Sequence, residues 1–477
     1  MIEARHRQRS FAEGFLTEAV DGFWDDWMRA VDRVLDDEDL VAIVYAALRK
    51  RRAQSRTRGR LGFPAEVVLR ILLLKHIRQW SFVVTERELR TNLLYREFTR
   101  VRGGKVPDAK TLGRLAQAVG PAVVASLHQR IVAIAQERQV IAGRKLRVDT
   151  TVVETNIHYP TDSSLLGDGV RVLTRLMKQA TAIAGATGTK LRDRTRSVKY
   201  RLLEIGRASR SKDVPAQKKL EGLYRKLLAA TSRVVGQAKR VAVEIAQGVK
   251  RGADVMQQAA LEGLKGELEQ MLPRVRQVMR QTRARVLGGD TRVPGKRVSL
   301  FEPTTEIIRK GKASKPTEFG KLVKIQEAEQ QIIVDYEVYA TRPSDRELLV
   351  PAIEVHRDRL GRVPDLVAAD AGFYSTAAEA AAKALGVRRV SVPNRATKSA
   401  ERRREQKKRW FKLAQKWRTG CEGRISVLKR RHGLTRCRYK GEAGMRRWVG
   451  LGVIGDNLIN LGTALARANR QSSTLHC

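Results

Sequence analysis

Two aspartates lie in segments whose composition could place them together in an active site. Asp149 is in the middle of Lys145–Val153, where β-branched residues dominate and predict a buried strand. Asp370 ends a second predicted strand, Asp365–Asp370. If these strands are neighbours, both carboxylates reach one edge of a sheet, where the active sites of α/β sheets gather. Either aspartate alone could simply end a strand, so the site needs a third acidic residue.

Residues 410–430 contain the third acidic candidate, Glu422. Read as a helix, the segment has an apolar stripe formed by Trp417, Cys421 and Leu428. Arg418, Glu422 and Lys429 lie within about 40° of one another beside this stripe, because steps of four and seven nearly repeat the helical turn. Such a helix could pack on the sheet and direct Glu422 toward the aspartates. A solvated Arg–Glu pair is the alternative explanation of the spacing. Two glycines weaken the helix prediction: Gly420 and Gly423.

The net charge of the chain indicates a polyanionic partner. The 477 residues include 94 Lys and Arg against 50 Asp and Glu, a formal charge of +44 at pH 7. So large an excess repels itself unless a polyanion screens it. Nucleic acid is the first candidate because neutralised phosphates provide most non-specific affinity; an unusually basic ordinary enzyme is the alternative. A dense basic cluster is expected to follow phosphates, with a solvated helix face as the alternative: Arg402, Arg403, Arg404, Lys407 and Lys408.

Several other classes of protein find no support in the sequence. No apolar run approaches the roughly 20 residues that span a bilayer, and the start resembles no signal peptide. Cys421, Cys437 and Cys477 match no zinc spacing, which indicates a reducing, cytoplasmic setting without disulfides. The histidines suggest neither a metal site nor a catalytic triad, and His158 and His432 are expected to be exposed spectators. No Walker pattern occurs, so no nucleotide cofactor is expected.

The elements that must position the three carboxylates follow from hydrophobic periodicity. Short helices fill the N-terminal part, one opening at Pro64 and another capped by Asp108. After the first strand, residues 165–287 predict amphipathic helices packed as an antiparallel hairpin or bundle, with strongly basic outer faces that favour DNA contact. The remaining elements complete an α/β core: a hairpin (319–326 and 332–340), a helix (343–360), the strand ending at Asp370, and a last strand (387–392).

We therefore expect an α/β fold with a mixed-sheet catalytic core, interrupted by a long helical insertion and preceded by an all-α N-terminal domain. The expected segments are an N-terminal domain for DNA-end binding or dimerisation (1–140), two parts of the core (141–164 and 296–440), a basic helical insertion (165–295), and a C-terminal helix and tail (441–477).

Five stretches around the candidate residues have the form of family motifs: Val148–Asn156, Tyr159–Ser163, Val367–Ser375, Glu422–Ser426 and Lys429–Leu434. In these stretches the sequence resembles bacterial insertion-sequence transposases with a D-D-E active site, and looks closest to the ISNCY type. The resemblance runs from about Gly62 to about Leu465. The spacing of Arg418, Glu422 and Lys429 matches part of a signature that such transposases share. That signature has a tyrosine three residues before the arginine, where this chain has Gln415.

The resemblance implies an RNase H-like catalytic domain, with the helical insertion between its first and second strands, and Mg²⁺ as the working metal. Carboxylates are hard oxygen ligands that suit Mg²⁺ or, as a substitute, Mn²⁺. Asp149 would bridge two ions, and Asp370 and Glu422 would each complete one, during in-line phosphodiester displacement. Water would be the nucleophile for end cleavage, and a terminal 3′-OH would be the nucleophile for joining to target DNA.

The expected partner is DNA, both as the terminal inverted repeats of the element and as the target. A homodimer is expected because two ends must be cut and joined together. Arg418 and Lys429 would hold phosphates beside the cut, together with Arg430 and Arg431 on the same helix. The expected location is the bacterial cytoplasm, in association with the nucleoid. Two alternatives stay open: a non-catalytic DNA-binding architectural protein, and an RNase H-like nuclease without strand transfer.

Overall fold

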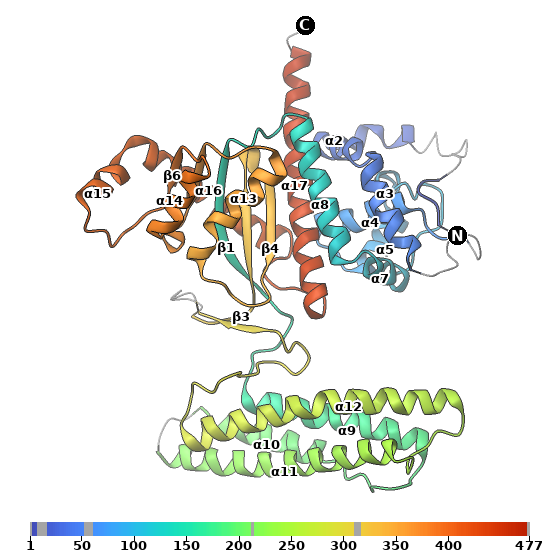
Figure 1. Ribbon diagram of the computed structural model, residues 1–477. Coiled ribbons are helices and arrows are strands. Elements are labelled where there is room, and N and C mark those ends of the chain that lie inside the picture. The colour runs from blue at the N-terminus through green and yellow to red at the C-terminus, as the bar shows by residue number, and fades with distance from the viewer. Residues whose placement is uncertain (1, 7–16, 52–60, 211–213, 310–315, 475–477) are drawn as a thin grey trace. The chain divides into compact units, whose positions relative to one another are not determined.

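The chain forms two compact units (Figure 1). The computed structural model describes residues 2–6, 17–51, 61–210, 214–309 and 316–474. The first unit, here called the core unit, combines Met1–Asn156 with Ile308–Cys477, and the second, the helical unit, is Ile157–Ile307. The predicted N-terminal and C-terminal segments and most of the predicted catalytic segments belong to the core unit, while residues 157–164 and 296–307 of the latter belong to the helical unit. The basic stretch 50–60 falls largely outside the described residues.

A mixed sheet lies at the centre of the core unit. Its strands are β1 (Lys145–Glu154), β2 (Glu306–Ile308), β3 (Glu318–Glu327), β4 (Ile333–Val338), β5 (Leu366–Ala369) and β6 (Arg389–Ser391). The order is β2-β3-β1-β5-β6, with β4 paired to β3. β1 runs antiparallel to β3 and parallel to β5, and β5 runs parallel to β6. The predicted strands and hairpin are confirmed, and the arrangement is consistent with the expected RNase H-like core.

Helices cover both faces of β1, which explains why its β-branched residues are buried on both sides. Val148, Val152 and Val153 are all at most 1% exposed although they point to alternating faces. On one side lies α13 (Leu349–Leu360), and on the other lies α16 (Arg409–Arg431). The helix predicted from residue 343 begins only at Leu349, because residues 345–347 form a separate 3-10 turn.

Short N-terminal helices pack beside the sheet. They are α2 (Asp26–Val34), α3 (Glu38–Arg49), α4 (Ala65–Ile77), α5 (Phe82–Thr91), α6 (Leu93–Phe98), α7 (Ala109–Ala118) and α8 (Pro121–Glu137). Both predicted starts are confirmed. Pro64 is the N-cap of α4, and the Asp108 side chain accepts a hydrogen bond from the Thr111 backbone N–H at 2.9 Å.

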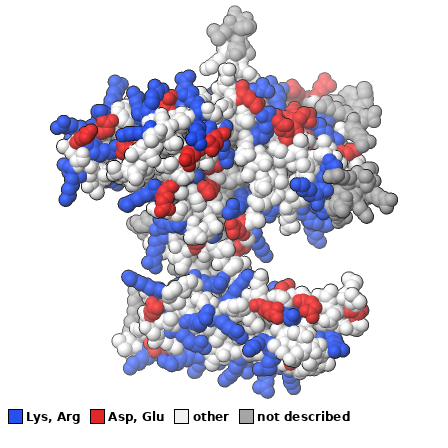
Figure 2. Space-filling model, in the orientation of Figure 1, with Lys and Arg blue, Asp and Glu red and all other residues white. Residues whose placement is uncertain are grey.

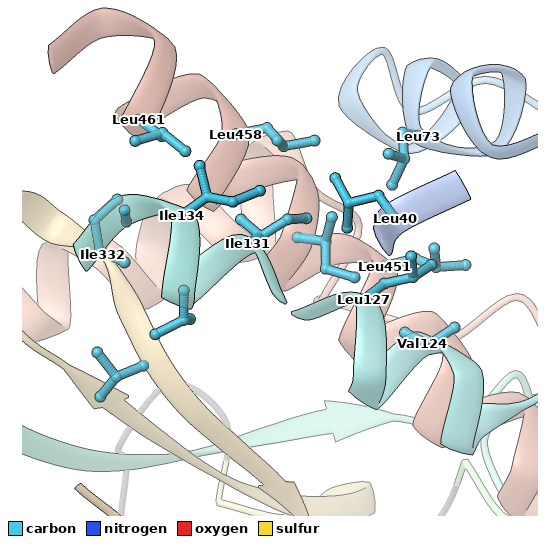
Figure 3. Close-up of a cluster of buried hydrophobic side chains, with 14 of the residues drawn as sticks. Leu40, Leu73, Val124, Leu127, Ile131, Ile134, Ile332, Leu451, Leu458 and Leu461 are labelled. Carbon is cyan, nitrogen blue, oxygen red and sulfur yellow. The ribbon is translucent and has the colours of Figure 1, made fainter. Parts of the chain in front are cut away.

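The C-terminal helix α17 (Gly441–Thr474) is a central element of the core unit. It packs against α2, α4, α8 and β4 (Figure 1). Figure 3 shows its apolar side chains meeting those of α3, α4 and α8: Leu451, Leu458 and Leu461 with Leu40, Leu73, Val124, Leu127, Ile131 and Ile134. By length and composition α17 could cross a membrane, as could the bent pair α7–α8 taken together, but 67% of the apolar window of α17 is buried inside the protein. That burial is typical of a core helix.

The helical unit is a bundle of four helices. These are α9 (Asp162–Ala184), α10 (Thr195–Ala208), α11 (Val214–Ala246) and α12 (Val255–Thr282). Its core includes the apolar positions expected from the seven-residue pattern, such as Leu173, Leu227 and Val234. The bundle prediction is confirmed, and the compact unit extends somewhat beyond the predicted limits of 165 and 295. Two further helices complete the chain, α14 (Thr376–Ala384) and α15 (Ala400–Lys407).

Candidate active site

The register of β1 and β5 brings the two candidate aspartates side by side. Val148 of β1 pairs with Ala369, the last residue of β5, and Asp149 and Asp370 are the residues that follow this pair. Neighbouring residues of parallel strands point to the same face of a sheet. Asp370 is exposed, and although it is the N-cap of the short turn Ala371–Phe373, its side chain makes no capping hydrogen bond. Its carboxylate is therefore not used to end the strand.

The helix α16 lies across this part of the sheet and brings Glu422 to it. α16 contacts β1, β5 and β6. Cys421 and Leu428 of the predicted apolar stripe are fully buried, and Trp417 is half-buried. The two glycines that weakened the helix prediction lie inside a continuous helix. Burial of the stripe turns the neighbouring face, with Arg418 and Glu422, toward the edge where the aspartates lie.

One guanidinium interacts with all three carboxylates. Arg418 Nη2 donates to Glu422 Oε1 at 2.7 Å, and its Nη1 is 3.8 Å from Asp149 Oδ2. Burial acts to lower the pKa of Arg418, but the hydrogen bond and charge of Glu422 and the charges of Asp370 and Asp149 outweigh it and raise the pKa above its ordinary value. All three predicted acidic residues thus interact with the same cation.

The three carboxylates differ in their access to solvent. The Asp149 side chain is 17% exposed and that of Glu422 is 55% exposed. Among the residues that the structure describes, no group of three His, Cys, Asp or Glu side chains stands close enough to hold a metal ion. The donor set nevertheless suits a hard divalent cation, since it offers three carboxylates from different elements. To bind such a cation, the exposed Glu422 side chain would have to break its ion pair with Arg418.

A buried ion pair fixes the distance between α16 and β1. Arg147, two residues before Asp149, donates to Glu327 Oε1 of β3 and to the backbone oxygen of Trp417 on α16. Its guanidinium also lies 4.9 Å from the centre of the Trp417 ring. A Cβ atom at Gly420 would overlap this guanidinium, so a larger residue there would have to displace Arg147. Burial raises the pKa of Glu327, and Arg147 opposes that shift.

A second buried pair joins α16 to α17. Arg424, two residues after Glu422, donates to Asp456 Oδ1 at 2.8 Å. His432 Nε2 lies 3.5 Å from the same oxygen, and the His432 side chain is only 1% exposed. The expectation of an exposed His432 is therefore wrong, because its ring lies beside Asp456 in the interior of the core unit. His158, by contrast, is 54% exposed.

Gln415 occupies the position where the transposase signature has tyrosine, and it connects α16 to two strand ends. Its Nε2 donates to Ser391 O at 2.7 Å, to Ser391 Oγ at 3.0 Å and to Ala369 O at 3.4 Å. Ala369 immediately precedes Asp370. The amide of Gln415 therefore holds the helix with Glu422 against the strand that ends at Asp370.

The predicted phosphate-contacting residues divide into two groups. Arg402 faces inward: it donates to Glu379 Oε1 at 2.8 Å and to Val392 O at 2.7 Å, and only 12% of its side chain is exposed. These contacts give Arg402 a structural role, and its expected phosphate contact stays a prediction. The others have exposed or half-buried side chains: Arg403, Arg404, Lys407, Lys408, Lys429, Arg430 and Arg431.

A fourth carboxylate lies near the site and was not expected from the sequence. The Thr150 hydroxyl, adjacent to Asp149, lies 3.3 Å from Asp345 Oδ1. A Cβ atom at Gly372, two residues after Asp370, would lie 3.5 Å from Asp345 Oδ2. Only the folded turn around residue 345 brings this carboxylate here, because its local sequence contains no strand or motif.

The fold and the site define an α/β protein with an RNase H-like core and an acidic site at the end of β5. Two family models match the chain: residues 23–118 match a Transposase domain (DUF772), and residues 379–462 match a Transposase DDE domain. Together they support an insertion-sequence DDE transposase, while the ISNCY type is not confirmed. No curated protein and no solved structure matches the chain. The DDE match includes α16 with Glu422 and Gln415, but begins after Asp149 and Asp370.

Proposed function

We propose that this transposase hydrolyses phosphodiester bonds at the ends of an insertion sequence and then joins the free 3′-OH ends to target DNA. The observation that carries the proposal is the interaction of Asp149, Asp370 and Glu422 with the single guanidinium of Arg418. Acidic residues from distant parts of the chain rarely gather around one exposed edge for structural reasons alone, because their mutual repulsion destabilises the fold.

Asp149, Asp370 and Glu422 would hold Mg²⁺, or Mn²⁺ in its place. When bound, the divalent cation supplies activation of the attacking oxygen and stabilisation of the leaving oxygen. The chain itself provides the orientation of the three carboxylates. Arg147 and Gln415 set the position of α16 against the sheet, and this position determines where Glu422 stands relative to the aspartates.

The cations around the site would orient the DNA strand. Once Glu422 releases Arg418, the guanidinium can donate two parallel hydrogen bonds to a phosphate. Lys429, Arg430 and Arg431 continue along α16 and would contact the flanking phosphates. The element ends would be held within a homodimer in the bacterial cytoplasm, associated with the nucleoid, since both ends must be cut and joined together.

The test is cleavage of DNA that carries the ends of the element, with Mg²⁺ present. Asp149→Asn should abolish cleavage and leave DNA binding within about twofold, because the amide keeps the shape of the side chain but loses its charge. Asp365→Asn is the matched control: this half-buried aspartate lies at the opposite end of β5 and pairs with Arg388, so cleavage should persist. Cleavage by Asp149→Asn would refute the assignment of Asp149, and absence of cleavage by the unchanged chain would favour a non-catalytic DNA-binding protein. Cleavage by the unchanged chain without joining of a free 3′-OH would favour a nuclease.

A further inference from the structure

The exposed face of α11 presents basic side chains in a seven-residue repeat. The positions are Lys218 and Lys219, Arg225 and Lys226, Arg233, and Lys239 and Arg240, and all seven side chains are exposed. We call these seven residues the α11 ridge. The opposite face follows the same repeat with buried residues of the bundle core, Leu227, Val234 and Val241. The packing of α11 thus directs every member of the ridge outward.

The ridge residues have no acidic partner among the residues that the structure describes. Three basic residues elsewhere in the helical unit do have one: Arg171 pairs with Asp168 at 2.7 Å, Lys178 with Asp193 at 2.6 Å, and Lys265 with Glu262 at 3.6 Å. Figure 2 shows Lys and Arg spread over the part of the helical unit where α11 runs. Solvation would explain an exposed polar face but not a face of a single sign.

The geometry of the ridge suits an extended polyanion. On a straight helix, residues seven positions apart differ by about 20° in direction around the helix axis. Over three such steps the ridge rotates by about 60°, so it stays on one side of the helix. Lys218 and Arg240 are about 33 Å apart along the helix axis, close to one turn of B-form DNA, about 34–36 Å. Small residues stand between the basic steps: Gly222, Ala229 and Gly236. No bulky side chain therefore prevents close approach along the ridge.

We propose that the α11 ridge binds duplex DNA lengthwise, by contacts to the phosphates of about one helical turn and without reading its sequence. The inference rests on the proposed function in taking DNA as the substrate, and adds which surface of the insertion holds it. Duplex is favoured over single strands because α11 has no exposed aromatic side chain on which bases could stack; its one aromatic residue, Tyr224, is buried.

The test measures the affinity of the full-length chain for a random-sequence duplex of about 30 base pairs, in EDTA, at 50–200 mM salt. Each lost phosphate contact should reduce the slope of log affinity against log salt by about 0.9. The triple variant Lys219→Gln, Lys226→Gln, Lys239→Gln should have a slope that is smaller by about 2.7 than that of the unchanged chain. Raising the salt from 50 to 200 mM should therefore reduce its affinity by a factor about 40-fold smaller than for the unchanged chain.

The matched control is Arg171→Gln, Lys178→Gln, Lys265→Gln, which removes three ion-paired charges from the same bundle and should change the slope by less than about 1. The triple Lys219→Arg, Lys226→Arg, Lys239→Arg keeps the charge and should keep the slope. Equal slopes for the two glutamine triples, loss of slope in the arginine triple, or equal competition by single-stranded RNA would each overturn the proposal. Binding in EDTA does not require Asp149, so cleavage by Asp149→Asn would refute the proposed function and leave this result standing.

Discussion

Arg418 and Glu422 form an ion pair one helical turn apart on α16, with Nη2 2.7 Å from Oε1. The same guanidinium lies 3.8 Å from Asp149 Oδ2. Arg418 therefore neutralises the charge that a divalent cation would neutralise in a site of three carboxylates. Because an arginine does not lose its proton near neutral pH, only movement of its side chain can remove this charge. Arg418 and a divalent cation should compete for the same carboxylates.

Arg418→Gln should therefore strengthen the binding of Mn²⁺ in the absence of DNA. The expected gain is about tenfold, which corresponds to about 1.4 kcal/mol and allows for partial solvent screening of the pair. Titration of free Mn²⁺ by electron paramagnetic resonance measures it without any cleavage reaction. Lys416→Gln removes an exposed charge from the same helix and should leave the affinity unchanged. An unchanged or weaker affinity in Arg418→Gln would contradict the competition.

Local sequence was sufficient to predict the elements of the site. The β-branched run around Asp149 predicted β1, the strand ending at Asp370 predicted β5, and the apolar stripe beside Glu422 predicted α16. Each of these patterns reports burial of one short segment, and such burial is encoded by the residues of the segment itself. The bundle of the helical unit was predictable for the same reason.

Contacts between distant segments could not be predicted. His432 was expected to be an exposed spectator, but its ring lies beside Asp456 of α17 in the interior of the core unit. Arg402 lies in a basic run, yet Glu379 and Val392 receive its guanidinium. The burial of His432 and of Arg402 depends on partners that are distant in the sequence. The spacing of residues within one segment contains no information about such partners.

Two glycines of α16 should respond in opposite directions to alanine. At Gly423 a Cβ atom meets nothing within 4 Å, so Gly423→Ala should stabilise the core unit by about 0.5–1 kcal/mol through helix propensity. At Gly420 the Cβ overlaps Arg147, which Glu327 and Trp417 hold in place, so Gly420→Ala should destabilise by about 1–2 kcal/mol. Tryptophan fluorescence during denaturation reports the core unit, since all six tryptophans lie there. Equal effects of the two substitutions would refute the close packing of α16 on Arg147.

Gln415→Glu should lower the cleavage rate without weakening DNA binding. The substituted carboxylate would face the carbonyl oxygens of Ala369 and Ser391 with no proton to donate, so α16 would shift away from the strand ends. Loss of such a supporting contact typically reduces metal affinity or activity by about 10–100-fold. Mn²⁺ affinity and cleavage rate should fall together, which mere destabilisation would not produce at a temperature where the variant stays folded. Lys416→Glu, its exposed neighbour, is the control, and a similar loss there would point to added negative charge instead.

Lys75 should make the core unit less stable at neutral pH than at alkaline pH. Burial, assisted by the nearby charge of Arg438, lowers the pKa of the Lys75 amine from 10.5 to about 8. This shift corresponds to a free-energy penalty of about 3 kcal/mol for the charged form in the folded protein. The surrounding rings of Phe82, Tyr439 and Trp448 offset part of this by attracting the cation.

Below pH 8 the Lys75 amine is charged in both folded and unfolded chains, so the penalty of burying it is fully present. Between pH 8 and 10.5 the unfolded chain binds more protons than the folded one, and the free energy of unfolding rises with pH until the penalty is gone. Lys75→Met should therefore stabilise by about 1–2 kcal/mol at pH 7 and by progressively less toward pH 10. Denaturation followed by tryptophan fluorescence at both pH values measures this, with the exposed Lys105→Met as control. A Lys75→Met variant that is less stable at pH 7 would mean that the three aromatic rings outweigh the burial of the charge.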